Sequence, residues 1–221
     1  HDLLDEGAPR ADPKTADSAI FYSISNAQTG LAGISFGNFL IKRVVDLLQA
    51  ELPNLKTFAT LSPIPGLMRW INSRKDDPDF RIGLTANERK ALLAALDMDD
   101  DGVSGIVLVD KALSREWWWQ DTALTDALKD PMQRLAARYL SVAKRSNGAA
   151  LDPVAHFHLA NGARMERLNW EGDLSPKGIK QSAGMMINYL YRLTEIEDNH
   201  EAYSDSGQVA MSSSIKTFAK V

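Results

Sequence analysis

The chain has 221 residues, of which 44% are hydrophobic and 24% are charged, an ordinary composition for a folded globular protein. Its net charge of −4 argues against a general nucleic-acid binder, and the absence of cysteine excludes a disulfide framework, a thiolate metal site and a cysteine nucleophile. No apolar run approaches the ~20 residues that span a bilayer, so we expect no membrane insertion.

The two ends of the chain read as polar segments. Residues 1–18 contain prolines and charges, begin without an initiator methionine or signal sequence, and are interpreted as a linker. We therefore expect the chain to be a fragment of a longer protein. Residues 200–221 are rich in serine and are predicted to form a C-terminal tail, mobile up to a short final apolar segment.

A predicted strand, a glycine loop and a helix come first. Residues 19–25 are aromatic and β-branched, which favours a strand, and a helix is predicted from Asn38 as its cap to a stop at Pro53. Between them the loop carries Gly30, Gly33 and Gly37. Such a loop before a helix exposes backbone N–H groups and can cradle a pyrophosphate. The spacing is neither Walker A nor Rossmann, so a turn without ligand remains equally open.

The second predicted strand, residues 57–61, runs into Leu-Ser-Pro-Ile-Pro-Gly. Ser62 carries a hydroxyl on a backbone that Pro63 and Pro65 make rigid. Such rigidity suits a catalytic group, because that group must be held in a fixed geometry. The alternative is a strand terminator in which Ser62 only caps the next segment of the chain.

A helical insertion is predicted over about 67–148. Asp97 opens an Asp-x-Asp-x-Asp-Gly segment resembling an EF-hand loop, but its twelfth position is Leu108 where the bidentate glutamate is needed, which favours a solvated acidic turn. Three consecutive tryptophans, 117–119, cannot share one helix face, so we expect at least one to be exposed or at an interface.

Two histidines follow in a stretch, residues 154–170, that we interpret as a strand or hairpin. On a strand His156 and His158 would share one face, and zinc uses such pairs. No residue stands at a recognisable spacing to supply a third ligand. The main alternative is therefore that these histidines are buried or hydrogen-bonded and have no catalytic or metal-binding role. The next segment, from Ser175 and Pro176 to about residue 196, is interpreted as a helix.

Four segments together resemble the catalytic domain of malonyl-CoA decarboxylases: FYSISNAQTGLAGISFGNFLIKRVV, FATLSPIPG, HFHLANGARMERLNW and GMMINYLYRL. They occur in order from about residue 19 to residue 193. The resemblance implies an α/β (α+β) fold with a GNAT-like mixed twisted sheet flanked by helices. The catalytic domain would occupy residues 19–199, with the helical insertion between two strands.

The resemblance also implies the reaction and its residues. The family converts malonyl-CoA to acetyl-CoA and CO2 without a metal, biotin or other prosthetic group, so no cofactor is expected. Its serine, histidine and tyrosine fall on Ser62, His158 and Tyr191. His158 would be the proton donor, with a pKa near neutrality, and Ser62 would hydrogen-bond the malonyl group. The CoA contacts would be Ala32, Gly33, Ile34, Ser35, Phe36, Gly37 and Asn38.

Partners follow from the same resemblance. The family has an N-terminal helical domain, so we expect a homo-oligomer, dimer or tetramer, with no nucleic-acid or membrane partner. The ending Ala-Lys-Val is not a peroxisomal signal, which favours a cytoplasmic enzyme. Leu190 stands where some members have an arginine, so a role of that side chain in CoA binding is not expected here.

Three alternatives remain: an N-acyltransferase of the same fold, a non-catalytic acyl-CoA-binding module and, more distantly, a metal-dependent hydrolase. The decarboxylase hypothesis requires Ser62 and His158 to lie within hydrogen-bonding reach, beside Gly33 and Gly37.

Overall fold

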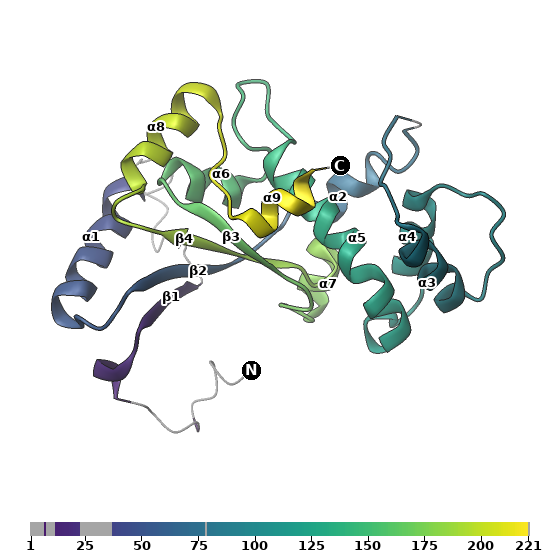
Figure 1. Ribbon diagram of the computed structural model, residues 1–221, viewed down its shortest axis with the longest axis horizontal. Helices are drawn as coiled ribbons and strands as arrows, with labels where there is room; N and C mark the ends of the chain where they lie inside the picture. The colour runs from purple at the N-terminus through teal and green to yellow at the C-terminus, as the bar shows by residue number, and fades with distance from the viewer. Residues whose placement is uncertain (1–6, 8–11, 23–36, 78, 221) are drawn as a thin grey trace.

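The computed structural model describes residues 7, 12–22, 37–77 and 79–220, with the backbone alone described at 37–40. Its centre is a four-stranded mixed sheet in the order β1-β2-β4-β3 (Figure 1). β1 and β2 are parallel, whereas β4 is antiparallel to both of its neighbours. The expected mixed sheet flanked by helices is confirmed. The strands are β1 Ser18–Tyr22, β2 Thr57–Pro63, β3 Arg164–Asn169 and β4 Met186–Tyr191.

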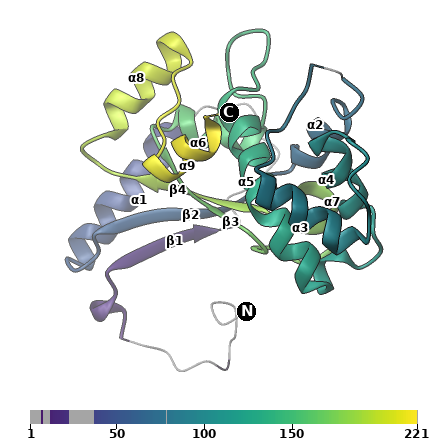
Figure 2. The ribbon, with the colours of Figure 1, turned by 45° about the vertical axis from the view of Figure 1, so that its right-hand side comes forward.

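Helices connect and cover the strands. α1, Gly37–Glu51, is the crossover that joins parallel strands β1 and β2. Helices α2 to α5 gather at one end of the sheet, and α1 and α8 lie toward the other end in both views (Figures 1 and 2). The remaining helices are α2 Leu67–Asn72, α3 Ala86–Leu96, α4 Gly105–Leu113, α5 Thr122–Ser141, α6 Pro153–Ala160, α7 Pro176–Ser182, α8 Ile196–Ser206 and α9 Ser213–Ala219.

The helical insertion between β2 and β3 forms as the sequence predicts. Thr85 caps α3 in a capping box with Glu88, whose carboxylate also pairs with Arg134 of α5 at 2.7 Å. α5 supplies most of the packing here, with Leu128, Met132 and other apolar residues buried along its length. The buried residues of the insertion therefore belong to the same apolar core as those of the sheet.

The interpretation of residues 154–170 as one strand or hairpin is wrong for its first half. His156 and His158 lie on helix α6, and only Arg164–Asn169 forms a strand. Asp152 caps α6, its side chain accepting from the backbone N–H of Val154 and Ala155, and Pro153 occupies the first turn. This cap overrides the short apolar alternation of His-Phe-His-Leu-Ala.

The interpretation of residues 175–196 as one helix is also wrong. Ser175 and Pro176 do start helix α7, but it ends at Ser182. Ala183 and Gly184 both have positive φ, 49° and 77°, a backbone geometry that stops a helix. Met186–Tyr191 then forms β4, which is paired on both sides in the middle of the sheet.

The segment expected as a mobile tail carries α9 and most of α8. Tyr203 and Ile215 are buried, and α9 packs against α5 and β3. This part of the chain is therefore part of the core.

Candidate functional site

Three elements bring Ser62, His158 and Tyr191 into one hydrogen-bonded chain. Ser62 lies near the end of β2, His158 on α6 and Tyr191 at the end of β4. Ser62 Oγ lies 3.1 Å from His158 Nε2, and Tyr191 Oη lies 2.8 Å from His158 Nδ1. All three side chains are buried. The expected approach of the serine and the histidine, which stand 96 residues apart, is present.

The hydrogen bonds around Ser62 define the tautomer of the imidazole. The Ser62 hydroxyl donates to Thr60 Oγ1 at 2.8 Å, so its oxygen is left to accept from His158 Nε2. The unprotonated Nδ1 then accepts from the Tyr191 hydroxyl. Every member of the chain is satisfied when the proton is on Nε2, the nitrogen that faces Ser62.

Burial keeps His158 neutral. Desolvation lowers its pKa from 6.5 to about 3, because the ring is only 2% exposed. Its ring stacks on Tyr189 with centroids 4.4 Å apart, which adds apolar surroundings on one side. Burial also raises the pKa of Tyr191, which keeps that hydroxyl protonated and able to donate. The pKa of His158 in the protein without substrate is therefore well below the near-neutral value expected from the sequence.

The two histidines do not form a pair. On a helix, residues two apart point in very different directions, and His156 Nδ1 instead lies 2.9 Å from the hydroxyl of Tyr203. Within the described ranges no group of three histidine, aspartate or glutamate side chains is placed to hold a metal ion. In the EF-hand-like segment, Asp100 pairs with Arg89 and accepts from the backbone N–H of Gly102.

A buried carboxylate, Asp152, joins the elements that carry Ser62 and His158. One oxygen caps α6, and the other accepts from the Tyr139 hydroxyl at 3.1 Å. The backbone N–H of Gly66, in the turn after Ser62, faces the same carboxylate. Burial raises the pKa of Asp152, and these hydrogen bonds oppose that rise.

Gly66 lies closely against Tyr139. A Cβ at this glycine would overlap the Tyr139 hydroxyl oxygen and lie 3.0 Å from Cζ. The turn after Ser62 therefore contacts the insertion helix α5 directly, without room for a side chain.

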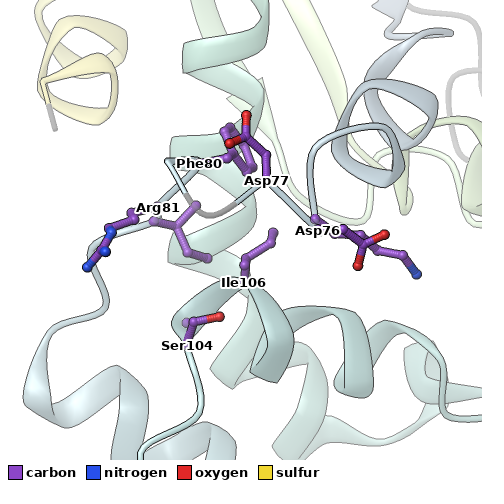
Figure 3. Close-up of a pocket in the computed structure, with 9 residues that line it drawn as sticks. Asp76, Asp77, Phe80, Arg81, Ser104 and Ile106 are labelled. Carbon is purple, nitrogen blue, oxygen red and sulfur yellow. The ribbon is translucent and has the colours of Figure 1, made fainter.

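The hollow shown in Figure 3 lies elsewhere. It measures about 360 Å³, lies between the segment before α3 and the start of α4, and contains none of the expected site residues. Ile106 lies toward the middle of the labelled side chains, while Arg81 extends away from them (Figure 3). Its lining residues are Lys75, Asp76, Asp77, Phe80, Arg81, Ile82, Ser104, Gly105 and Ile106.

The tryptophan cluster divides as its spacing predicts. Trp117 is 56% exposed, whereas Trp118 is 3% exposed and stacks on Trp170. Trp118 thus packs the insertion against the segment after β3.

The expected CoA contacts lie largely outside the described residues. Ala32, Gly33, Ile34, Ser35 and Phe36 fall in 23–36, and of Gly37 and Asn38 only the backbone, at the start of α1, is described.

Sequence reasoning missed three polar residues of the site. Thr60 could have been found, because it stands two positions before Ser62 and so shares its strand face. Asp152 precedes a proline, which is a helix-start signal. Nothing in the sequence marks Tyr139, which reaches Asp152 from a helix of the insertion.

Comparison with protein families places the chain. A family model described as the C-terminal domain of malonyl-CoA decarboxylase matches residues 1–221. The mitochondrial malonyl-CoA decarboxylase of the goose Anser anser anser is 39% identical over 217 residues, covering 96% of this chain and 42% of the relative. The rat protein of the same name is 40% identical over 203 residues, covering 90% of this chain and 40% of the relative. The chain thus spans about two fifths of these relatives.

Solved structures agree in fold. The malonyl-CoA decarboxylase of Rhodopseudomonas palustris is 47% identical, superposes with a TM-score of 0.80 and is matched over 98% of this chain and 45% of its own. That of Agrobacterium vitis is 45% identical with a TM-score of 0.79, over 100% of this chain and 49% of its own.

Proposed function

The chain belongs to the malonyl-CoA decarboxylase family, and from this membership we propose that the protein converts malonyl-CoA to acetyl-CoA and CO2. The observation that carries the proposal is the buried hydrogen-bonded chain from Tyr191 through His158 to Ser62. An N-acyltransferase or a simple CoA-binding module has no need of such a chain.

The first step is loss of CO2 from the bound malonyl thioester. The bond between the α-carbon and the carboxylate breaks, CO2 leaves, and the electron pair moves into the thioester carbonyl as an enolate. Hydrogen-bond donors aimed at the enolate oxygen lower the barrier. The Ser62 hydroxyl and the Nε2–H of His158 become these donors when the substrate oxygen replaces their acceptors in the substrate-free protein, Thr60 Oγ1 and Ser62 Oγ. The thioester is itself the electron sink, so we propose that no cofactor takes part.

The second step is protonation of the α-carbon. A substrate carboxylate beside the imidazole favours the charged form and raises the pKa of His158 from its substrate-free value of about 3. The imidazole then takes up one proton from water at Nδ1, its unprotonated nitrogen, and gives its Nε2 proton to the α-carbon; a proton shift from Nδ1 to Nε2 restores the starting tautomer. Tyr191 holds the opposite nitrogen and orients the ring. One proton is consumed for each CO2 released, which balances the reaction.

The wider assignments belong to the same proposal. We propose that residues 32–38 hold the CoA pyrophosphate, that the protein acts as a homo-oligomer and that it works in the cytoplasm without nucleic-acid or membrane partners. The domain limits, 19–199 with linker and tail, follow the resemblance. In the part of the chain that the structure describes, no helix is long and apolar enough to cross a membrane.

One assay tests the reaction. The purified protein is given malonyl-CoA in the presence of EDTA, with and without an amine acceptor, and acetyl-CoA and CO2 are followed. We expect CO2 release in both cases, and its loss in Ser62→Ala and in His158→Ala.

Two outcomes contradict the proposal. Malonyl transfer to the amine without CO2 release identifies an acyltransferase. Full activity of His158→Ala removes that side chain as the proton donor. His156→Ala is the matched control, because His156 contacts the Tyr203 hydroxyl and is not part of the hydrogen-bonded chain from Tyr191 through His158 to Ser62.

A further inference from the structure

A cationic hollow opens beside the turn after Ser62. It measures about 550 Å³ and lies between α2 and α7, which pack against each other. Arg69 projects from α2, and Lys177 and Lys180 lie three positions apart on α7, a spacing that places them on one helix face. The lining residues of this cationic hollow are Pro65, Arg69, Pro176, Lys177, Lys180 and Gln181.

The hollow lies at the end of the sheet that carries Ser62. Pro65 stands three residues after Ser62, in the turn between β2 and α2. α7 leads into β4, whose first residues Met186 and Ile187 pair with Pro63 and Ser62. A ligand whose reacting group reaches Ser62 therefore has this hollow close by.

Among the residues that the structure describes, no carboxylate neutralises the charges of the hollow. No carboxylate is among the lining residues, and within the described ranges Arg69, Lys177 and Lys180 make no ion pair. Asp173, before α7, is held by the backbone N–H of Ser175. Three cations facing one space repel one another, in a protein whose net charge is −4. An anionic ligand turns this repulsion into attraction.

We propose that the cationic hollow binds a phosphate of the CoA portion of the substrate. The inference rests on the proposed function, because CoA carries a pyrophosphate and a 3′-phosphate. Charged phosphate oxygens accept strong hydrogen bonds from guanidinium and ammonium groups, and the arginine can bind two oxygens at once. All three cations are exposed, so they can meet a ligand that arrives from water.

The test compares two triple variants by calorimetric titration with CoA. Arg69→Gln, Lys177→Gln and Lys180→Gln together remove the charge of the hollow. Lys90→Gln, Lys216→Gln and Lys220→Gln remove the same charge from exposed lysines on α3 and at the end of the chain. We expect the first variant to bind CoA about tenfold or more weakly than wild type and the second to bind as wild type does. The difference should shrink as salt is raised.

Titration with 3′-dephospho-CoA identifies the phosphate. If the hollow variant binds this analogue as well as wild type does, the 3′-phosphate is the ligand; if it loses affinity for both compounds, the hollow binds the pyrophosphate together with residues 32–38. Equal CoA affinity of the two triple variants overturns the proposal. CoA lacks the malonyl carboxylate, so cations that bind only that group also give this negative result.

The result separates the two proposals. If CoA binding depends on the cations of the hollow but no decarboxylation is seen, the phosphate site is supported and the proposed reaction is contradicted. If decarboxylation is seen but CoA binding does not depend on these cations, the proposed reaction is supported and the phosphate site is contradicted. Absence of CoA binding by wild type contradicts both.

Discussion

His158 is enclosed by the aromatic side chains of β4. Tyr189 stacks on its ring, and two residues later Tyr191 donates to Nδ1. The two hydroxyls differ sharply, because the Tyr189 hydroxyl is buried without a hydrogen-bond partner in the part of the chain that the structure describes. This contrast supplies a matched pair of variants on one strand.

We expect Tyr191→Phe to lower the rate of decarboxylation at least about tenfold with little change in KM, because Nδ1 loses the donor that sets the tautomer. Tyr189→Phe removes only an unsatisfied hydroxyl and should leave the free energy of unfolding equal or slightly higher. Steady-state kinetics and urea unfolding of both variants check this. A rate loss in Tyr189→Phe as large as in Tyr191→Phe contradicts the role of the Nδ1 contact.

The lowered pKa of His158 also makes stability depend on pH. Below its unfolded-state pKa of 6.5 the unfolded chain binds a proton at this position, whereas the folded chain does so only near its own pKa of about 3. The contribution of the neutral ring is thus present above 6.5 and is lost as pH falls toward 3.

Between about pH 7 and about pH 5, His158→Gln should lose about 2 kcal/mol less unfolding free energy than wild type does. Urea titrations at both pH values measure the two losses. Equal losses in the two proteins would show that the folded-state pKa is not depressed.

At the level of elements, the strands and helices with one clear signal were predictable. α1, the insertion helices and β2 followed from periodicity, glycine and proline. The strand of Met186–Tyr191 was not, because its residues are apolar or aromatic on both faces except for Asn188, so the sequence lacks the alternation that distinguishes a strand from a helix. The segment His-Phe-His-Leu-Ala was predicted as a strand but lies on helix α6. Five residues are too few to show a period, and the helix cap, Asp152, lies outside them.

The site itself was predictable only through the resemblance. Ser62 and His158 come together because the fold brings β2 and α6 within hydrogen-bonding distance, which no local pattern encodes. Thr60, Asp152 and Tyr139 become visible only once the chain is folded.

The cap of α6 gives a prediction at the element scale. Asp152→Ala removes the acceptor for two backbone N–H groups and leaves the buried Tyr139 hydroxyl unsatisfied, so we expect a loss of about 2 kcal/mol in unfolding free energy. Asp152→Asn keeps one capping oxygen and should lose clearly less. Equal losses in the two variants, measured by urea unfolding, would falsify the capping role.

At the scale of the whole molecule, the contact between Gly66 and Tyr139 connects the insertion to the sheet. Gly66→Ala forces a methyl group against the Tyr139 hydroxyl, and overpacking of this kind costs about 1–3 kcal/mol. Tyr139→Phe removes the overlapping oxygen and should restore part of the loss when combined with Gly66→Ala. A double-mutant cycle by thermal or urea unfolding measures the coupling, and strictly additive effects contradict the contact.

The position of β4 in the sheet affects the order in which the strands can pair during synthesis. β4, one of the two inner strands of the sheet, is the last of the four along the chain, and the Asn188 side chain donates to the Thr60 carbonyl across 128 residues. During synthesis β2 is made long before β4, so the edge of β2 that β4 will cover is still unpaired. Loop closure of this length favours slow folding. The Tyr191–His158–Ser62 hydrogen-bonded chain thus forms only when β4 joins the sheet, so a nascent chain that has already made Ser62 and His158 still lacks the hydroxyl that donates to Nδ1.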